Sequence, residues 1–349
     1  QLQVTAPDAI DLTGTTNLSS AFHSATNFNG AIGNWDVTNV TNMANMFLGA
    51  SSFNQPLNDW GSKTANVTDM SRIFFAATAF NQPLNSWNVS SVTTFYQAFY
   101  AAYAFNSSLL GWTPSSATTM YQMFFSATAF NQPIDWTQTA AVTTMNGMFY
   151  NADAFDQSLA SLNTSHVTDM SSMFQETANF NGDVSTWDTS SVTTTANMFY
   201  AALKFNNSAG LSDWDTGNVT NMSQMFSYAP LFNQAIGAWD TSKVTNLSNM
   251  FRYSPDFNQP LDDWDVSKVT NMSRMFEGVE AFNQDLNSWN TGNVTGGGMT
   301  YMFYGASSFN GQIGNWNVSK ITDFSWFLRE ASAFNQDVSQ WDTSSVTNF

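Results

Sequence analysis

The sequence predicts an α/β repeat solenoid, in which about 14 coils of about 25 residues stack along one axis. The main observation is a Phe that recurs along all 349 residues and is followed by Asn in every repeat but one, where Asp156 takes its place. Successive members are 25 or 27 residues apart: Phe28, Phe53, Phe80, Phe105, Phe130, Phe155, Phe180, Phe205, Phe232, Phe257, Phe282, Phe309 and Phe334. A fixed period in this range is typical of solenoids, which bind partners along their faces.

Two apolar spacings within each repeat predict a short strand and then a short helix. In the repeat FNQPLDDWDVSKVTNMSRMFEGVEA, Trp264 and Val266 are two residues apart, as on a strand whose alternate side chains face the core. The apolar residues that follow are Val269, Met272, Met275 and Phe276. Their steps of three, three and one favour a helix, with Ser and Thr ahead of it as N-caps. A pure β-solenoid, in which V-T-x-M is also a strand, is the alternative.

The strands are expected to form a parallel sheet on one face and the helices to cover the other. No linker interrupts the period, so we expect a single domain over residues 1–349 that ends part-way through a repeat. No polar cap follows the last repeat, which indicates either a longer protein or ends that are covered by another copy. Two extra residues enter at three places, where surface loops are expected: between Trp60 and Val67, between Phe205 and Trp214, and at Gly296 to Gly298.

The composition argues against several function classes. The net charge is −17 and only 10% of residues are charged, so no basic patch is present to bind nucleic acid or an anionic membrane. No stretch approaches the roughly 20 apolar residues that cross a bilayer. The only histidines, His23 and His166, lie nearly six coils apart, and no catalytic motif is present. We therefore expect a protein that is not an enzyme and has no cofactor, calcium being the one exception considered.

The run FNQPLNSWNVSSVT, from Phe80 to Thr93, resembles the leucine-rich repeats of BspA-type surface proteins, and related repeats occur in mycoplasma lipoproteins. The resemblance extends over nearly the whole chain. It implies a leucine-rich-repeat-like fold, an extracellular or cell-surface location and a role in adhesion or interaction. It implies no catalytic residue.

The residue after Trp forms a column of Asp or Asn, which includes Asp188, Asp215, Asp240 and Asp265 in four consecutive repeats. In-register carboxylates repel one another, so calcium is one hypothesis for what offsets the repulsion. The alternative is that each side chain caps the following turn by accepting backbone N–H bonds. Asn88 in the same column favours capping, because Asn caps without charge. A melting curve unchanged by EDTA or calcium would exclude the calcium hypothesis.

A second aromatic residue follows the last Phe of the predicted helix in six repeats: Phe75, Tyr100, Phe125, Tyr150, Tyr200 and Tyr304. One position beyond a buried Phe, these side chains are expected to be partly exposed and to bind a protein or a glycan. Packing between neighbouring coils is the alternative. The Asn column after the recurring Phe is expected to form an internal amide ladder that satisfies backbone groups of the turns. An exposed sugar- or ice-binding array is the alternative.

Sequons for N-glycosylation are frequent, and four lie in the column before Val, at Asn39, Asn66, Asn218 and Asn293. If the source is a secreting eukaryote, these turn positions are expected to carry glycans.

The sequence therefore predicts an extracellular, non-enzymatic interaction module that adheres to protein or glycan partners. A structural subunit of an extracellular fibre, assembled head to tail through the solenoid ends, is the alternative.

Overall fold

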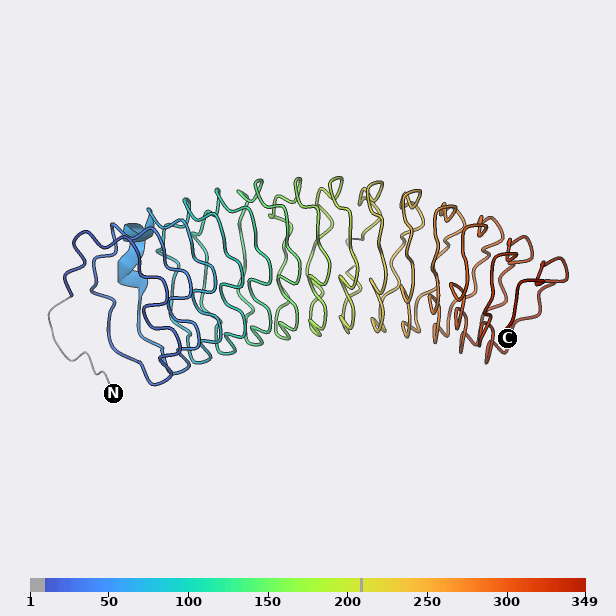
Figure 1. The fold of residues 1–349 in the computed structure, drawn as a ribbon, viewed down its shortest axis with the longest axis horizontal. Helices are drawn as coiled ribbons and strands as arrows, with labels where there is room; N and C mark the ends of the chain where they lie inside the picture. Colours follow the sequence, from blue (N-terminus) through green and yellow to red (C-terminus); the bar gives the residue numbers. More distant parts are fainter. Residues whose placement is uncertain (1–9, 208–209) are drawn as a thin grey trace. The chain divides into compact units, whose positions relative to one another are not determined.

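The computed structural model describes residues 10–207 and 210–349. The chain divides into two compact units, the first formed by Gln1–Val167 with Glu176–Asp183 and the second by Thr168–Gln175 with Val184–Phe349. Within each unit the chain follows a succession of similar coils (Figure 1). The single domain over residues 1–349 stays a prediction.

Neighbouring coils are joined by isolated parallel β-bridges between equivalent residues of successive repeats. The bridged residue stands between Thr and Met in V-T-x-M. In the first unit the bridges join Asn17, Asn42, Asp69, Thr94, Thr119 and Thr144 in order. In the second they join Asp169, Thr194, Asn221, Asn246 and Asn271 in order, and a further equivalent pair is Asp323 with Asn348. Gly296, in the third insertion, pairs instead with Ile321, which stands at the Val position of its repeat. This register confirms a repeat solenoid within each unit, because equivalent residues of successive repeats lie side by side.

The helix expected at Met-x-x-Met-Phe is wrong, since these segments are series of turns. In the segment 70–77, every second backbone N–H donates to the next coil: Arg72 to the Tyr96 oxygen at 2.8 Å, and Ala76 to the Tyr100 oxygen at 2.7 Å. Between these two residues, Ile73 and Phe75 donate their N–H groups to the carbonyl three residues back. Arg72 and Ala76 have φ values of 53° and 51°, which a type II turn requires at its third residue. An α-helix would direct all these N–H groups along its own axis.

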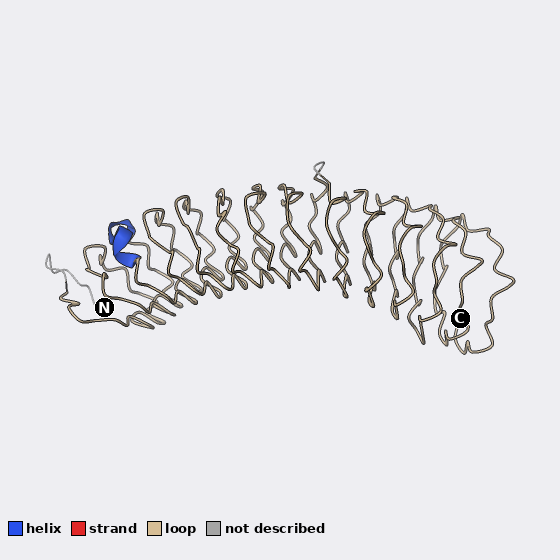
Figure 2. Cartoon of the chain, turned by 90° about the horizontal axis from the view of Figure 1, so that it is seen from above, coloured by secondary structure: helices blue, strands red, loops and turns tan. Residues whose placement is uncertain are grey.

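The strand expected at W-x-V is also not formed in the described parts of the chain (Figure 2). Pairing occurs instead at V-T-x-M, where the β-solenoid alternative places a strand, but only as single bridges. The one helix among these residues is the 3₁₀ helix η1 at Asn58–Thr64, which is broken at Gly61, where φ is 42°. It accommodates the first of the three insertions. The second insertion, before Trp214, falls partly outside the described residues.

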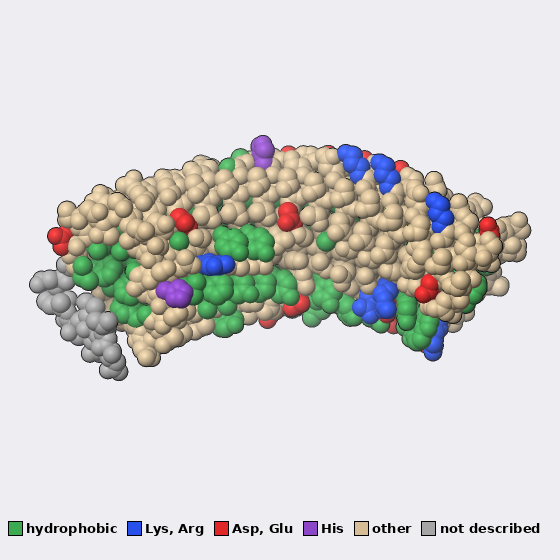
Figure 3. All heavy atoms as spheres, viewed as in Figure 1, with side chains coloured by type: hydrophobic (Ala, Val, Ile, Leu, Met, Phe, Trp, Pro, Cys, Tyr) green, Lys and Arg blue, Asp and Glu red, His purple; other side chains and the backbone are tan. Residues whose placement is uncertain are grey.

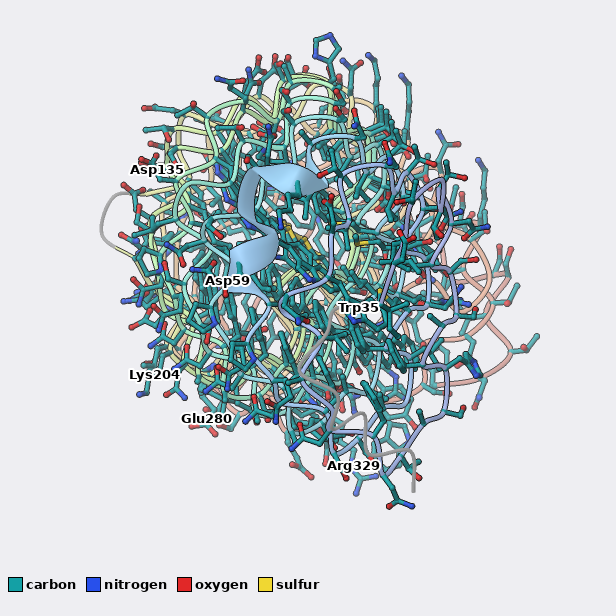
Figure 4. All side chains as sticks on the ribbon, turned by 90° about the vertical axis from the view of Figure 1, so that its left-hand side faces the viewer. Trp35, Asp59, Asp135, Lys204, Glu280 and Arg329 are labelled. Atoms are coloured by element: carbon teal, nitrogen blue, oxygen red, sulfur yellow. The ribbon has the colours of Figure 1, made fainter. Side chains whose placement is uncertain are left out.

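Columns of aromatic side chains fill the interior of each unit. Phe74 and Phe80 of one coil stack with ring centroids 4.0 Å apart, and Phe74 lies 5.5 Å from Phe99 of the next coil. These three rings are fully buried. Trp35 also lies in the interior, whereas Asp135 lies at the outer edge in the view of Figure 4. The Phe, Trp and Met columns therefore form the core that the sequence predicts.

The buried tryptophans also form a ladder of hydrogen bonds. Trp87 donates its Nε1–H to the Leu57 carbonyl oxygen of the preceding coil at 3.0 Å, and Trp112 donates to that of Leu84 at 2.8 Å. Trp136 stands one residue early in its repeat. Its buried Nε1 has no hydrogen-bond partner within residues 10–207 and 210–349. The shift of one residue keeps the ring in the core but removes the bond.

The Asn column forms the expected amide ladder, on the surface rather than in the interior. The Oδ1 of Asn29 accepts the backbone N–H of Asn54 at 2.9 Å and the Nε2 of Gln55 at 3.0 Å. The same bond joins Asn233 to Asn258 at 3.0 Å in the second unit. These side chains are exposed or half-buried. Each Asn thus satisfies a backbone donor of the following coil, which explains why the residue recurs.

We expect Trp112→Phe to lower the free energy of unfolding by about 1 kcal/mol more than Trp136→Phe, since only Trp112 loses a hydrogen bond. Both tryptophans are buried, so both variants lose a similar volume. Urea unfolding of the two variants and the parent chain measures the difference. Equal losses, or a larger loss for Trp136→Phe, would contradict this account of the ladder.

Candidate functional site

Four aromatic side chains form a continuous row on the surface of the first unit. Phe75, Tyr100, Phe125 and Tyr150 belong to four successive coils, and each is half-buried. Successive ring centroids are 4.5, 4.4 and 4.3 Å apart, and successive ring planes are within 7° of parallel. We call these four residues the aromatic row. Hydrophobic side chains form a contiguous band on one face of this unit (Figure 3).

The stacking decides which part of each ring a partner can reach. Tyr100 and Phe125 have a parallel ring on both sides, so their faces are covered and their edges remain. At the last ring, the Tyr150 hydroxyl donates to Glu176 Oε1 at 3.0 Å. Ring edges carry the positive part of the aromatic quadrupole. A flat ligand therefore cannot stack along the row, whereas the side chains of a protein can pack against its edges.

Tyr200 and Tyr304 lie in the second unit and are not members of this row. The equivalent residues of the three coils between them are Ser227, Arg252 and Glu277. Tyr200 meets Tyr228 edge to face at 5.5 Å, and Tyr304 lies 5.4 Å from Trp326. The structure thus brings together four of the six aromatic residues that the sequence singles out.

A buried carboxylate with two arginines interrupts the column in the second unit. Arg252 Nε and Arg274 Nη1 each lie 3.0 Å from Glu277 Oε2, and the Tyr253 hydroxyl donates to Glu277 Oε1 at 2.8 Å. Burial raises the pKa of Glu277, but the hydrogen bonds from Arg252 and Tyr253 and the two guanidinium charges outweigh it, and the pKa lies below its ordinary value. The hydrogen bond to Glu277 raises the pKa of Tyr253. This cluster is not among the predicted sites, although Arg252 and Glu277 stand at the same position of adjacent repeats.

Asp188, Asp215, Asp240 and Asp265 are exposed on four successive coils of the second unit. Each Oδ1 accepts the backbone N–H two residues later, at distances of 2.9 to 3.0 Å: from Ser190, Gly217, Ser242 and Ser267. This is the turn-capping arrangement, and Asn88 makes it without charge, to Ser90 at 3.0 Å. No group of three or more His, Cys, Asp or Glu side chains suited to a metal occurs in the described residues. Calcium binding stays a prediction.

The four sequon asparagines are exposed, but three of them are engaged. The side-chain Nδ2, which glycosylation would modify, donates to a carbonyl of the preceding coil at 2.9 Å for Asn66 and at 2.7 Å for Asn218 and Asn293. A glycan at any of these three residues would take one of the two Nδ2 hydrogens and leave the other for that bond. Asn39 is the fourth. Glycosylation stays a prediction.

Hydrogen bonds lower the pKa of two members of the Asp column. The hydroxyl and then the backbone N–H of Ser242 lower the pKa of Asp240, and those of Ser267 lower the pKa of Asp265. The positive charge of Lys268 acts in the same direction on both. The ionised carboxylate is therefore the form that caps the turn.

We expect the chain to lose stability as the pH falls below about 4, the ordinary pKa of an aspartic acid. Since the pKa of Asp240 and Asp265 is lowered on folding, their contribution is complete above the unfolded pKa and is lost as the pH falls through the folded pKa. Melting curves by circular dichroism between pH 7 and pH 2 measure the loss. The double variant Asp240→Asn/Asp265→Asn keeps both acceptors without titrating, so its melting temperature should fall less. An equal fall in both proteins would contradict the prediction.

A family model described as "Mycoplasma protein of unknown function, DUF285" matches almost the whole chain, at residues 5–112, 61–139, 118–211, 207–298 and 297–349. No curated protein matches the chain. No helix in the described part of the chain has the length and apolar character that spanning a membrane requires.

Several solved structures are distantly similar. A leucine-rich repeat protein from Bacteroides ovatus is 11% identical, with 94% of this chain and 87% of that chain covered and a TM-score of 0.36. A chain of the TLR13–ssRNA13 complex is 9% identical, with 85% and 50% covered and a TM-score of 0.24. A chain of the Drosophila Toll–Spatzle complex is 9% identical, with 84% and 44% covered and a TM-score of 0.27. This chain thus spans half or less of the length of the latter two.

Proposed function

We propose that this chain, which belongs to the DUF285 family, is a non-enzymatic interaction module that binds a protein partner at the cell surface or outside the cell. The aromatic row is the observation that carries this proposal. The family is shown by the matches along the chain. The resemblance to BspA-type surface proteins supports the location and an adhesive role.

The row has the properties of a protein-binding surface. It is apolar and contiguous over four coils, and aromatic residues are enriched where interfaces derive most of their binding energy. Stacking already holds the rings in place, so a partner orders few side chains on binding. Because the faces of the inner rings are covered, the row favours a protein over a glycan that stacks on it.

We expect the triple variant Tyr100→Ser/Phe125→Ser/Tyr150→Ser to lose partner binding and to stay folded. Loss of the stacked pairs costs about 1 kcal/mol for each pair, whereas the core columns remain. Arrays of extracellular matrix proteins and glycans, probed with parent and variant, measure binding, and circular dichroism measures folding.

The control is Tyr200→Ser/Tyr304→Ser, which removes two half-buried tyrosines outside the row and should bind as the parent does. An unfolded triple variant would assign the row to the core. A folded triple variant that binds as the parent does would exclude the row as the binding surface.

A fibre subunit is the second candidate function, and one apolar surface favours it. In the second unit, Phe324, Trp341 and Phe349 border a hollow of about 530 Å³, and Phe349 is 78% exposed. A second copy that packs a different surface against it would cover these apolar side chains. Such a contact does not close on itself and leads to fibres.

If this surface joins copies, the parent chain should form larger species as its concentration rises, because each contact buries apolar surface. Light scattering during size-exclusion chromatography and electron microscopy measure this. Phe349→Ser should shift assembly to higher concentration. A chain that is monomeric at every concentration would exclude the fibre.

A further inference from the structure

All four arginines of the chain place a guanidinium over an aromatic ring. The distances from the guanidinium carbon to a ring centroid are 5.1 Å for Arg72 over Tyr96, 4.7 Å for Arg252 over Tyr253, 4.1 Å for Arg274 over Tyr301, and 3.9 Å for Arg329 over Trp326. Arg72 is the one arginine of the first unit. It also lies 5.9 Å from the centroid of Phe75, the first ring of the aromatic row.

A ladder of amide side chains orients the Arg72 guanidinium. Its Nε donates to Gln97 Oε1 at 2.8 Å, and Gln97 Nε2 donates in turn to Gln122 Oε1 at 2.7 Å. This chain of bonds fixes Gln97 with its oxygen toward Arg72. The two Nη groups are left for another acceptor.

Arg274, which is the equivalent of Arg72 in another coil, shows which kind of group accepts hydrogen bonds from a guanidinium at this position. Arg72 and Arg274 occupy the same position of the repeat, three residues before Phe75 and Glu277 respectively. Arg274 Nη1 pairs with the Glu277 carboxylate at 3.0 Å. Where Glu277 supplies that carboxylate, the coil of Arg72 has the ring of Phe75. No carboxylate of residues 10–207 or 210–349 lies within ion-pairing distance of Arg72, although the chain carries 26 acidic residues.

A hollow adjoins this guanidinium. Its volume is about 380 Å³, and its lining consists of Leu48, Arg72, Phe75, Gln97 and Tyr100. The size lies within the range of small-molecule sites, and so does the combination of apolar walls with a few polar groups. A guanidinium pairs with a carboxylate through two parallel N–H···O bonds, which gives such a site its specificity.

We propose that this hollow binds a carboxylate joined to a ring of monosaccharide size, with the carboxylate on the Arg72 Nη groups and the ring against Phe75 and Leu48. The ligand carboxylate takes the part that Glu277 plays beside Arg274. A uronic acid of an acidic glycan and a free aromatic acid share this chemistry. The hollow shares Phe75 and Tyr100 with the aromatic row, but the recognition of a carboxylate by Arg72 does not depend on the protein-binding role of the row.

Calorimetric titration of the full chain with galacturonate and with phenylacetate tests the proposal. Galactose and phenylacetamide are the matched neutral probes. At least one acid should bind at low salt, and its neutral partner should bind at least tenfold more weakly, because the guanidinium recognises charge. The acid that binds more tightly identifies the source of the ligand. Failure of both acids to bind, or equal binding of the neutral probes, would overturn the proposal.

Arg72→Gln should weaken binding of the acid at least tenfold. Glutamine fits this backbone, because Gln97 and Gln122 occupy the same left-handed position in the next two coils, with φ of 53° and 51°. Arg72→Lys should give an intermediate loss, since an ammonium does not pair in the two-bonded geometry. Unchanged binding by a folded Arg72→Gln variant would place the site elsewhere.

Phe75→Glu copies the arrangement of Arg274 and Glu277, and it should abolish binding by supplying an internal carboxylate. Phe75→Leu is its control, and should retain weaker, charge-dependent binding. Equal effects of the two variants would contradict the internal pairing. Arg72→Gln leaves the aromatic row intact, so the protein-binding arrays report on the proposed function separately.

Discussion

The hydrogen bonds between coils are the constraint on which the rest of the structure depends. Every second N–H of the turn segment donates to the next coil, as Arg72 and Ala76 do, so equivalent residues must lie next to one another. Each side chain then has its own counterparts as neighbours. Aromatic rings stack in columns, tryptophan Nε1 groups bond to the preceding coil, and the Asn ladder satisfies backbone donors. The 25-residue period of the sequence follows from this requirement that equivalent residues lie side by side.

The sequence predicted these columns well, because a column needs only the period. It predicted the buried Phe, Trp and Met residues, the capping by the Asp column and the Asn ladder. It did not distinguish the turn series from a helix, since both bring Met70, Phe74 and Ala77 to one side. The two structures differ in the acceptor of each backbone N–H, which the sequence does not show. The pair Arg274–Glu277 was missed for a different reason: it joins two columns, whose separation depends on the shape of the coil. Arg72 and Gln97 share one column, but they are different side chains, so no repeated residue marks that pair.

In-register stacking stabilises some kinds of side chain and destabilises others. Rings and amides gain from having copies of themselves as neighbours, so the aromatic row and the Arg72–Gln97–Gln122 chain extend over several coils. Like charges repel, and the Asp column persists because each carboxylate accepts hydrogen bonds from its own turn. A buried carboxylate such as Glu277 occurs with two arginines around it. The hollow beside Arg72 lies where two columns change, from Leu48 to Phe75 and from Arg72 to Gln97.

The left-handed residues of the turn segments have a mechanical consequence. Arg72, Ala76 and their equivalents adopt a backbone conformation that non-glycine residues disfavour, and the bonds to the next coil hold them there. A coil pulled away from its neighbour loses those bonds, and apart from η1 no coil in residues 10–207 and 210–349 has a helix or sheet of its own to retain. In a partly unfolded molecule, the border between the folded and the unfolded part of the chain must therefore lie between two coils. Under tension each unit should unwind as a moving front, and its resistance is set by one coil contact rather than by the number of coils.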